Sequence, residues 1–248
     1  MEISLAAEPV FHIGSMPITN SLVVGVIVVV LFIILALVVS HKKLSDVPRG
    51  LQNLLETVME TVLDFMTSVT GNRDQAIKFF PLAATIFFFV LLSNWFGLLP
   101  GVGTIGIYEV KEGHTILVPL LRSASADLNT TLAIALASVI GTQIFGILAI
   151  GFVKHAGKYL NFRNPILFFV GLLELVGELA RVMSFSFRLF GNVFAGEVLL
   201  LVVSALIPFI APLPFLFLEI FVGLVQALVF SLLTLVFMTI ATAEHAEH

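Results

Sequence analysis

The stretch from Pro165 to Ile207 reads PILFFVGLLELVGELARVMSFSFRLFGNVFAGEVLLLVVSALI and contains no polar loop. A single helix of this length would measure about 65 Å, at a rise of about 1.5 Å per residue. The hydrocarbon core of a bilayer is only about 30 Å thick. The stretch is therefore predicted to be either two spans, broken near residues 174–181, or one helix that lies strongly tilted in a membrane.

Arg188 lies inside this stretch and is flanked mostly by apolar and small residues. A charge at bilayer depth costs about 2.5 kcal/mol or more, and a guanidinium group cannot escape this cost by losing its proton. Arg188 must therefore face a polar interior or meet an anion. We interpret it as a functional residue, and the alternative is a structural arginine paired with a neighbouring glutamate.

The composition indicates a membrane protein with several helical spans. The chain has 248 residues, of which 59% are hydrophobic and 11% charged, and its mean hydropathy is +1.12. The ten-residue alternation of a membrane β-barrel is missing. The net charge of −4 gives no indication of a nucleic-acid partner. Because the chain has no cysteine, thiol chemistry and cysteine-ligated metals are excluded, and no metal or cofactor site is predicted.

The fold predicted for residues 1–248 is a single all-α polytopic membrane domain. Its three ordinary spanning helices are predicted at residues 21–40, 79–99 and 128–153, since each is apolar over about 20 residues or more. Residues 1–20 are predicted to form an outer N-terminal segment, and residues 101–126 an outer loop.

The basic residues predict how the chain is oriented. They gather in the segments assigned to the cytoplasm, as Lys42, Lys43, Arg49, Arg73, Lys78, Lys154, Lys158 and Arg163. The outer segments carry only Lys111 and Arg122. By the positive-inside rule, the N-terminus is predicted to lie outside and the C-terminus in the cytoplasm.

Residues 47–69 differ from the spans, because polar residues recur every four positions, as Gln52, Glu56, Glu60 and Asp64. Apolar residues fill the opposite face at helical spacing. The pattern predicts an interfacial amphipathic helix on the cytoplasmic surface. Because its polar face is acidic and suits anionic lipid poorly, packing against a partner subunit is the alternative.

The prolines at 208, 212 and 214 predict a turn after the long stretch. Residues 214–243 would then return as a second long apolar helix. The two stretches, 165–207 and 214–243, are predicted to form a C-terminal hairpin of two long, strongly tilted intramembrane helices.

Polar residues in this hairpin fall into a pattern. On a continuous helix, one stripe carries Glu174, Glu178, Arg181, Arg188 and Asn192. Ser184 flanks the stripe, and Glu197 lies on another face nearer the outer end. In an antiparallel hairpin, Gln226 would meet the depth of Arg188, and Glu219 the depth of Glu197.

These residues suggest two proton routes that do not connect. Carboxylates in a low dielectric can exchange protons near neutral pH, whereas a permanent cation between them repels a passing proton. The inner route would contain Glu174, Glu178 and Ser184, and the outer route Glu197, Glu219, Asn192 and Gln226. Arg188 would separate the two routes. The alternative for Glu174, Glu178 and Arg181 is an ion-pair cluster with no transport role.

Five motifs, in matching order along the chain, resemble subunit a of the membrane (Fo) sector of rotary F-type ATP synthases, in the bacterial or chloroplast form. The most specific is Ser186-Phe187-Arg188-Leu189-Phe190-Gly191-Asn192 with Ala195-Gly196-Glu197. The others are Pro48-Arg49-Gly50-Leu51-Gln52-Asn53, Ser93-Asn94, Ser125-Ala126-Asp127-Leu128-Asn129 and Leu224-Val225-Gln226-Ala227.

The resemblance implies specific roles. Arg188 would be the essential arginine that faces a ring of c subunits, deprotonates their carboxylates and separates the half-channels. Asn192, Glu197 and Gln226 would line the outer half-channel or support this arginine. Glu219 stands where some relatives have a histidine, and Glu174 matches an acidic position of the inner half-channel. Many relatives have proline at the position of Val182, so a kink there is less expected in this chain.

The resemblance also implies partners and a location. These are the c-ring, b-type peripheral stalk subunits, membrane lipid and protons, with Na⁺ as the alternative coupling ion. The chain would not be an enzyme on its own, because ATP is formed in other subunits. The bacterial plasma membrane is the expected location, with the thylakoid membrane as the alternative. A secondary transporter whose Arg188 binds an anionic substrate is the competing hypothesis, but the repeated halves that it requires are missing. A purely structural membrane subunit would leave the stripe of charges unexplained.

Overall fold

The computed structural model describes residues 7–14, 16–41, 47–99, 102, 105–111, 114–159, 165–208 and 210–243. Over these residues it has seven α-helices and two small hairpins. Five helices are long and apolar enough to cross a membrane. The predicted fold class, an all-α polytopic membrane protein, is therefore confirmed. Lys42, Lys43 and Arg163, on which the predicted orientation partly depends, lie outside the described residues.

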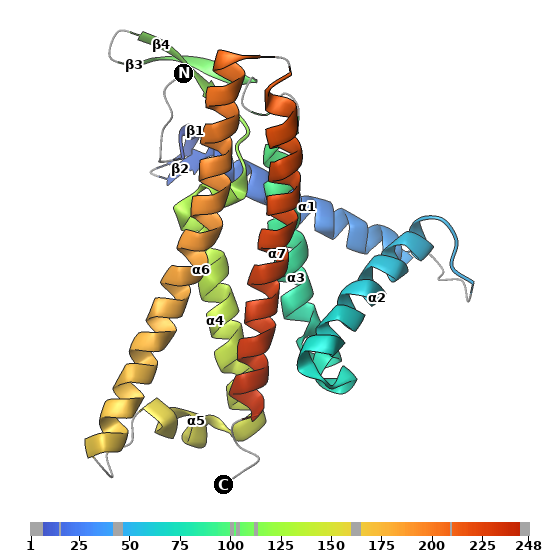
Figure 1. The fold of residues 1–248 in the computed structure, drawn as a ribbon, viewed down its shortest axis with the longest axis vertical. Coiled ribbons are helices and arrows are strands. Elements are labelled where there is room, and N and C mark those ends of the chain that lie inside the picture. Colours follow the sequence, from blue (N-terminus) through green and yellow to red (C-terminus); the bar gives the residue numbers. More distant parts are fainter. Residues whose placement is uncertain are drawn as a thin grey trace.

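The five candidate spans are α1 (Asn20–His41), α3 (Arg73–Gly97), α4 (Leu128–Ile150), α6 (Pro165–Leu206) and α7 (Pro212–Ala243). In Figure 1, α3, α4, α6 and α7 form the bundle, and α1 runs outward from it toward α2. Buried side chains of α1 lie in its first part, up to Val28, where the helix contacts α3. The short α5 (Phe152–Tyr159) lies at the end of the bundle where α6 begins (Figure 1).

The length of α6 decides between the two predictions for this stretch. The helix is continuous over 42 residues, which corresponds to about 63 Å. No break occurs between Glu174 and Arg181, and Val182 is buried within the unbroken helix. Figure 1 shows α6 and α7 side by side at the end where they are joined and diverging toward the other end, where α4 contacts both.

The ends of the helices follow local backbone chemistry. Residues 51–70 form α2 (Leu51–Thr70), which ends at Gly71 in the left-handed conformation, with φ of 69°. Asn72 then begins α3, because its side-chain oxygen accepts hydrogen bonds from the N–H groups of Asp74 and Gln75. At the end of α4, Gly151 has φ of 85°, so the helix stops before residue 153 and α5 follows as a separate element.

Two antiparallel hairpins lie in segments where no strands were predicted. Strands β1 (Pro9–Ile13) and β2 (Met16–Thr19) precede α1, and β3 (Gly106–Lys111) pairs with β4 (His114–Pro119). The predicted outer loop of residues 101–126 therefore contains a hairpin and a short 3₁₀ helix, η1 (Ala124–Ala126). In Figure 1, β3 and β4 lie at the end of the bundle where α6 ends and α7 begins.

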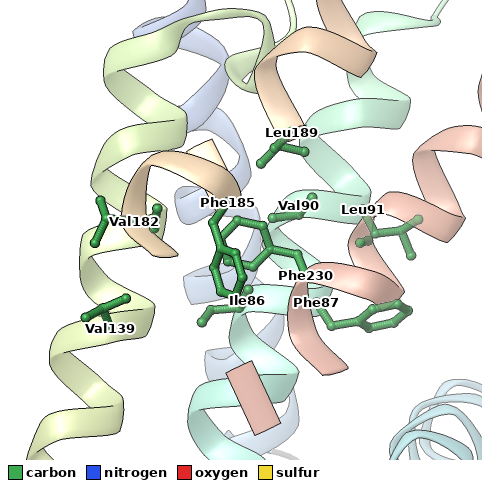
Figure 2. Packing of buried hydrophobic residues seen from close by; sticks show 11 residues of the cluster. Ile86, Phe87, Val90, Leu91, Val139, Val182, Phe185, Leu189 and Phe230 are labelled. Carbon is green, nitrogen blue, oxygen red and sulfur yellow. The ribbon is translucent and has the colours of Figure 1, made fainter. Parts of the chain in front are cut away.

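The main core lies between α3, α4, α6 and α7. Figure 2 shows Phe185 of α6 pointing toward Phe230 of α7, and their ring centroids are 4.9 Å apart. Leu189, one turn further along α6, is fully buried. Hydroxyl contacts also join the helices, with 3.0 Å between the oxygens of Thr131 and Ser186. Such interhelical hydrogen bonds are typical of membrane bundles. The core fixes which face of α6 is buried, and so which face points outward.

Candidate functional site

Arg188 lies on the outward face of α6, because its neighbours Phe185 and Leu189 occupy the core. Its side chain is exposed, and Nη2 donates a long hydrogen bond of 3.4 Å to Ser184 Oγ. Among the described residues, no carboxylate lies within ion-pair distance of Arg188. The hypothesis of a structural arginine tied to a neighbouring glutamate therefore has no support in the structure.

The surface around Arg188 is apolar and open. Met183 and Phe187 on the same helix are about half exposed, at 48% and 50%. Gly177 and Gly191 have no neighbouring atom within 4 Å of an added Cβ. In a membrane this surface must meet lipid or a partner, and a guanidinium group in lipid without an anion is costly.

Asn192 and Gln226 join the two long helices one turn beyond Arg188. Asn192 Nδ2 donates to Gln226 Oε1 at 2.8 Å, and Gln226 is only 5% exposed. The sequence placed Gln226 at the depth of Arg188, and the structure brings it to Asn192. Among the described residues, Gln226 Nε2 is buried without a hydrogen-bond partner.

Glu197 pairs with a residue that sequence reasoning missed. Arg122 reaches Glu197 Oε2 through Nε at 2.9 Å and through Nη2 at 2.8 Å. Arg122 is 8% exposed, and its Cζ lies 5.8 Å from the ring centroid of Phe194. In the sequence it was counted only as a basic residue of the outer loop, and its place just before the Ser125–Asn129 motif was the only available signal.

The carboxylate of Glu219 on α7 packs against Gly196 of α6, the residue before Glu197. A Cβ added at Gly196 would overlap this carboxylate, so the Glu219 side chain would have to shift. The contact joins α6 and α7 at the level where the sequence predicts the two outer carboxylates.

About two turns before Arg188 on α6, Arg181 and Glu178 form an ion pair. Arg181 Nη1 donates to both carboxylate oxygens of Glu178 at 2.9 Å. Its guanidinium group also lies over the Phe237 ring, with 3.7 Å between Cζ and the centroid. Part of the predicted inner set is therefore a tightly paired cluster, as the ion-pair alternative required.

This pair lines a cavity of about 210 Å³ between α4, α5, α6 and α7. Glu174 also lines it, so the structure brings both predicted inner glutamates together. Sequence reasoning missed the remaining polar wall, where Gln143 Oε1 lies 2.6 Å from His155 Nε2 and accepts from the Tyr159 hydroxyl at 3.0 Å. A polar cavity of this size can hold several water molecules. Ser184 lies outside this lining, beside Arg188.

The fold and these contacts define a polytopic helical membrane protein in which two long C-terminal helices carry ionisable residues at three levels. Comparison with known proteins then identifies its family. The family model described as ATP synthase A chain matches residues 22–239, and this chain belongs to that family, subunit a of the membrane (Fo) sector of ATP synthase. It is thus a multi-pass membrane component of a multi-subunit complex for ATP synthesis and ion transport.

Curated relatives agree with this assignment. The ATP synthase subunit a of Syntrophobacter fumaroxidans is 37% identical over 225 residues, which cover 88% of this chain and 83% of the relative. That of Campylobacter jejuni is 35% identical over 241 residues, covering 96% and 91%. That of Gloeobacter violaceus is 33% identical over 240 residues, covering 96% and 90%.

Proposed function

We propose that this chain is the stator that provides two offset proton half-channels and the arginine that deprotonates carboxylates of a c-ring. The observation that supports this most is the exposed Arg188 on an apolar face of α6, with no carboxylate of the described chain in ion-pair range. A cation placed in this way needs an anion from outside the chain. A ring of carboxylates that pass the arginine one after another would supply it.

The outer route would begin at Glu197 and Glu219 and continue to the Asn192–Gln226 hydrogen bond. A proton entering there would neutralise a ring carboxylate, and the neutral group could then turn into lipid. The inner route would use the polar cavity beside Glu174 and Glu178, into which a ring carboxylate would release its proton. Arg188 lies between the two and favours the ionised carboxylate, since an opposite charge stabilises it.

Arg188 would also act as the barrier between the routes. A fixed positive charge in a low dielectric repels a proton that moves directly from one route to the other. Protons would then cross only by travelling with the ring. Each elementary charge that crosses gains about 2.3 kcal/mol per 100 mV of membrane potential, so several crossings would be needed for one ATP.

The length of α6 suits this role. A helix of about 63 Å exceeds the bilayer thickness of about 30 Å, so it fits within the membrane only if strongly tilted. A tilted hairpin would offer a long lateral surface to a curved ring. Ser184, which accepts a hydrogen bond from Arg188, lies on that surface toward the inner end.

The other partners follow from the remaining surfaces. The exposed apolar residues Leu51, Leu54 and Val58 on α2 would contact lipid or a b-type peripheral stalk subunit. We place the chain in a bacterial plasma membrane with its N-terminus outside and its C-terminus in the cytoplasm, by the positive-inside rule. Catalysis of ATP formation would belong to other subunits, and protons would be the coupling ion.

Proton-driven ATP synthesis in vesicles that contain the assembled complex tests this proposal. We expect Arg188→Ala to abolish synthesis while the chain remains in the purified complex. Arg73→Ala is the matched control, because Arg73 is an exposed arginine whose ion pair, at 2.8 Å, is with the equally exposed Asp64. Normal synthesis with Arg188→Ala would contradict the proposal and return this arginine to a structural role.

A further inference from the structure

Two neighbouring side chains near the end of α3 donate hydrogen bonds to the backbone of α7. Trp95 Nε1 donates to the Ile220 carbonyl at 3.1 Å. Asn94 Nδ2 donates to the Gly223 carbonyl at 3.2 Å. We propose that these two residues, the α3 donor pair, are positioning residues that hold α7 in the orientation in which its polar side chains meet α6. The inference rests on the proposed function, because those side chains belong to the outer proton route.

The bonds from the α3 donor pair are additional to those that form α7. Both carbonyls lie within an unbroken helix, so each also accepts the backbone N–H four residues further on. A carbonyl oxygen has two lone pairs, and the side-chain donor uses the second. The bonds from α3 are therefore not needed for α7 to be helical. They determine how α7 is rotated and at what height it lies against α3.

Gly223 allows α3 to approach this part of α7 closely. A Cβ added at Gly223 would lie 3.2 Å from Asn94 Cβ and 3.5 Å from Trp95 Cδ1. Asn94 is also only 4% exposed, so its amide is enclosed in the contact between the two helices. Both donors reach the backbone of α7 because no side chain at position 223 separates the helices.

The alternative for Trp95 is an anchor at the membrane surface. Tryptophan is common near the ends of spans, where its N–H reaches the polar interface. Trp95 is 37% exposed and lies in the last turn of α3, which agrees with such a role. However, its only polar atom, Nε1, is bonded to α7. Anchoring does not require this bond, so the bond indicates a second role that is directed at α7.

The side chains that meet α6 lie on the neighbouring face of α7. Glu219 and Gln226 are seven residues apart, and at about 100° per residue they share one stripe of the helix. Ile220 and Gly223, whose carbonyls accept the α3 bonds, lie about 80° further around the helix. Thus α3 holds one face of α7 while the adjacent face meets α6.

The contacts between α7 and α6 depend on this orientation. The Glu219 carboxylate packs against Gly196 of α6. Gln226 Oε1 accepts from Asn192 Nδ2 at 2.8 Å. A slip of α7 by one residue would turn its side chains by about 100° and move them about 1.5 Å along the axis. Both contacts would then be lost, and the same slip would break the bonds from the α3 donor pair.

The orientation of α7 can be measured by cross-linking, because the chain has no cysteine of its own. Asn192→Cys and Gln226→Cys replace the two side chains that touch between α6 and α7. A short bifunctional thiol reagent is applied to the assembled complex, and the joined peptides of this chain are identified by mass spectrometry. We expect the double variant Trp95→Phe, Asn94→Leu to lose most of this cross-link.

Proton-driven ATP synthesis is measured on complexes without the two cysteines. We expect Trp95→Phe, Asn94→Leu to lose about 100-fold per assembled complex, as a displacement of about 1 Å can cause. Trp95→Phe alone should have a smaller effect in the same direction, because the other bond remains. It is also the cleaner change, since Asn94 carries Oδ1 as well, which is buried without a hydrogen-bond partner among the described residues. Gly223→Ala disturbs the same contact from α7 and should also lower synthesis.

Two control variants separate positioning from a general loss of hydrogen bonds. Thr85→Val removes a hydroxyl on α3 that bonds within the same helix, to the Pro81 carbonyl at 2.6 Å. Ser231→Ala removes another bond between α7 and α3, from Ser231 Oγ to the Ala83 carbonyl at 2.8 Å. Ser231 lies 12 residues beyond Glu219, about 18 Å along the helix. Both controls should keep the cross-link and the rate of synthesis per complex.

The outcomes distinguish this inference from the proposed function. An unchanged cross-link in Trp95→Phe, Asn94→Leu would overturn the inference, as would a lost cross-link with normal synthesis or an equal loss in Ser231→Ala. The proposed function would then still stand if Arg188→Ala abolishes synthesis. Normal synthesis by Arg188→Ala would refute the proposed function, whatever the cross-link shows. If the double variant does not assemble, the same two measurements on Trp95→Phe decide the inference.

Discussion

Arg188 differs from two other arginines in contact with α6 in how the chain treats its positive charge. About two turns before it on α6, Arg181 is paired with Glu178 and stacked on Phe237. Further along α6, Arg122 is buried against Glu197. Arg188 itself is exposed, and among the described residues its guanidinium group only donates a long hydrogen bond to Ser184 Oγ. The chain can thus satisfy an arginine internally, and the proposed function accounts for the exposure of Arg188 by a partner carboxylate from outside the chain.

The packing explains why the difference arises within one helix. Arg181 and Arg188 are seven residues apart, about 10 Å along the axis and on nearly the same stripe. Near Arg181, α4 and α7 lie close enough for Phe237 to cover the guanidinium group. Around Arg188 the neighbouring side chains on the same face remain open. The local surroundings, and not the residue type, decide which arginine is available.

Among the predictions in this section, the largest effect on ATP synthesis is expected when the Glu219 side chain is displaced at the outer end. Gly196→Ala places a Cβ where the Glu219 carboxylate lies, so the side chain must shift. We expect ATP synthesis to fall about 100-fold, the effect of a displacement of about 1 Å in a positioned group. Because the displaced group is the end of a flexible side chain, the chain should still assemble.

The matched control for this substitution is Gly157→Ala in α5, where an added Cβ meets nothing within 4 Å. Synthesis at the normal rate by Gly196→Ala, in complexes that contain the chain, would contradict the importance of this close approach.

Breaking the ion pair between Glu178 and Arg181 should have a smaller effect, and the quantity that changes should be the stability of the chain in the complex. Arg181→Gln leaves Glu178 without its partner, and the two side chains are 23% and 15% exposed. We expect a cost of about 2 kcal/mol, between the values for exposed and buried pairs. The double variant Glu178→Gln, Arg181→Gln should recover most of it. Retention of this chain in the purified complex on heating provides the measurement.

The same double variant decides between the two interpretations of the inner cluster. If Glu178 belongs to the inner proton route, ATP synthesis per assembled complex falls even though stability is recovered. If Glu178 and Arg181 are only an ion pair, synthesis per complex stays at the level of the unaltered protein.

Much of the fold follows from the sequence, because apolar runs of bilayer length leave few choices in a membrane. The stripe that holds Arg181 and Arg188 could also be predicted, since helical geometry fixes which residues share a face. Continuity of α6 could not be predicted, because the same apolar run fits two short spans or one tilted helix. The structure resolves the choice, since α6 is one helix whose Val182 and Phe185 lie in the core.

The contacts that sequence reasoning missed join residues far apart in the chain. Arg122 and Glu197 are 75 positions apart, and Arg122 lies in a connecting segment without periodicity. Gln143 and His155 lie on either side of the break at Gly151, where α4 ends and the chain changes direction so that the two side chains meet. The outer hairpin β3–β4 gave no signal, because its short strands lack an apolar alternation strong enough to predict a sheet.

The most direct test of the role of Arg188 is the passive proton permeability of vesicles that hold the assembled complex, measured without nucleotide. If Arg188 is the barrier between two half-channels, Arg188→Ala should let protons leak through complexes that no longer make ATP. Glu219→Gln, which closes the outer route, should show neither leak nor synthesis. Vesicles with Arg188→Ala that stay as tight to protons as the unaltered complex, while still synthesising ATP, would contradict the central claim.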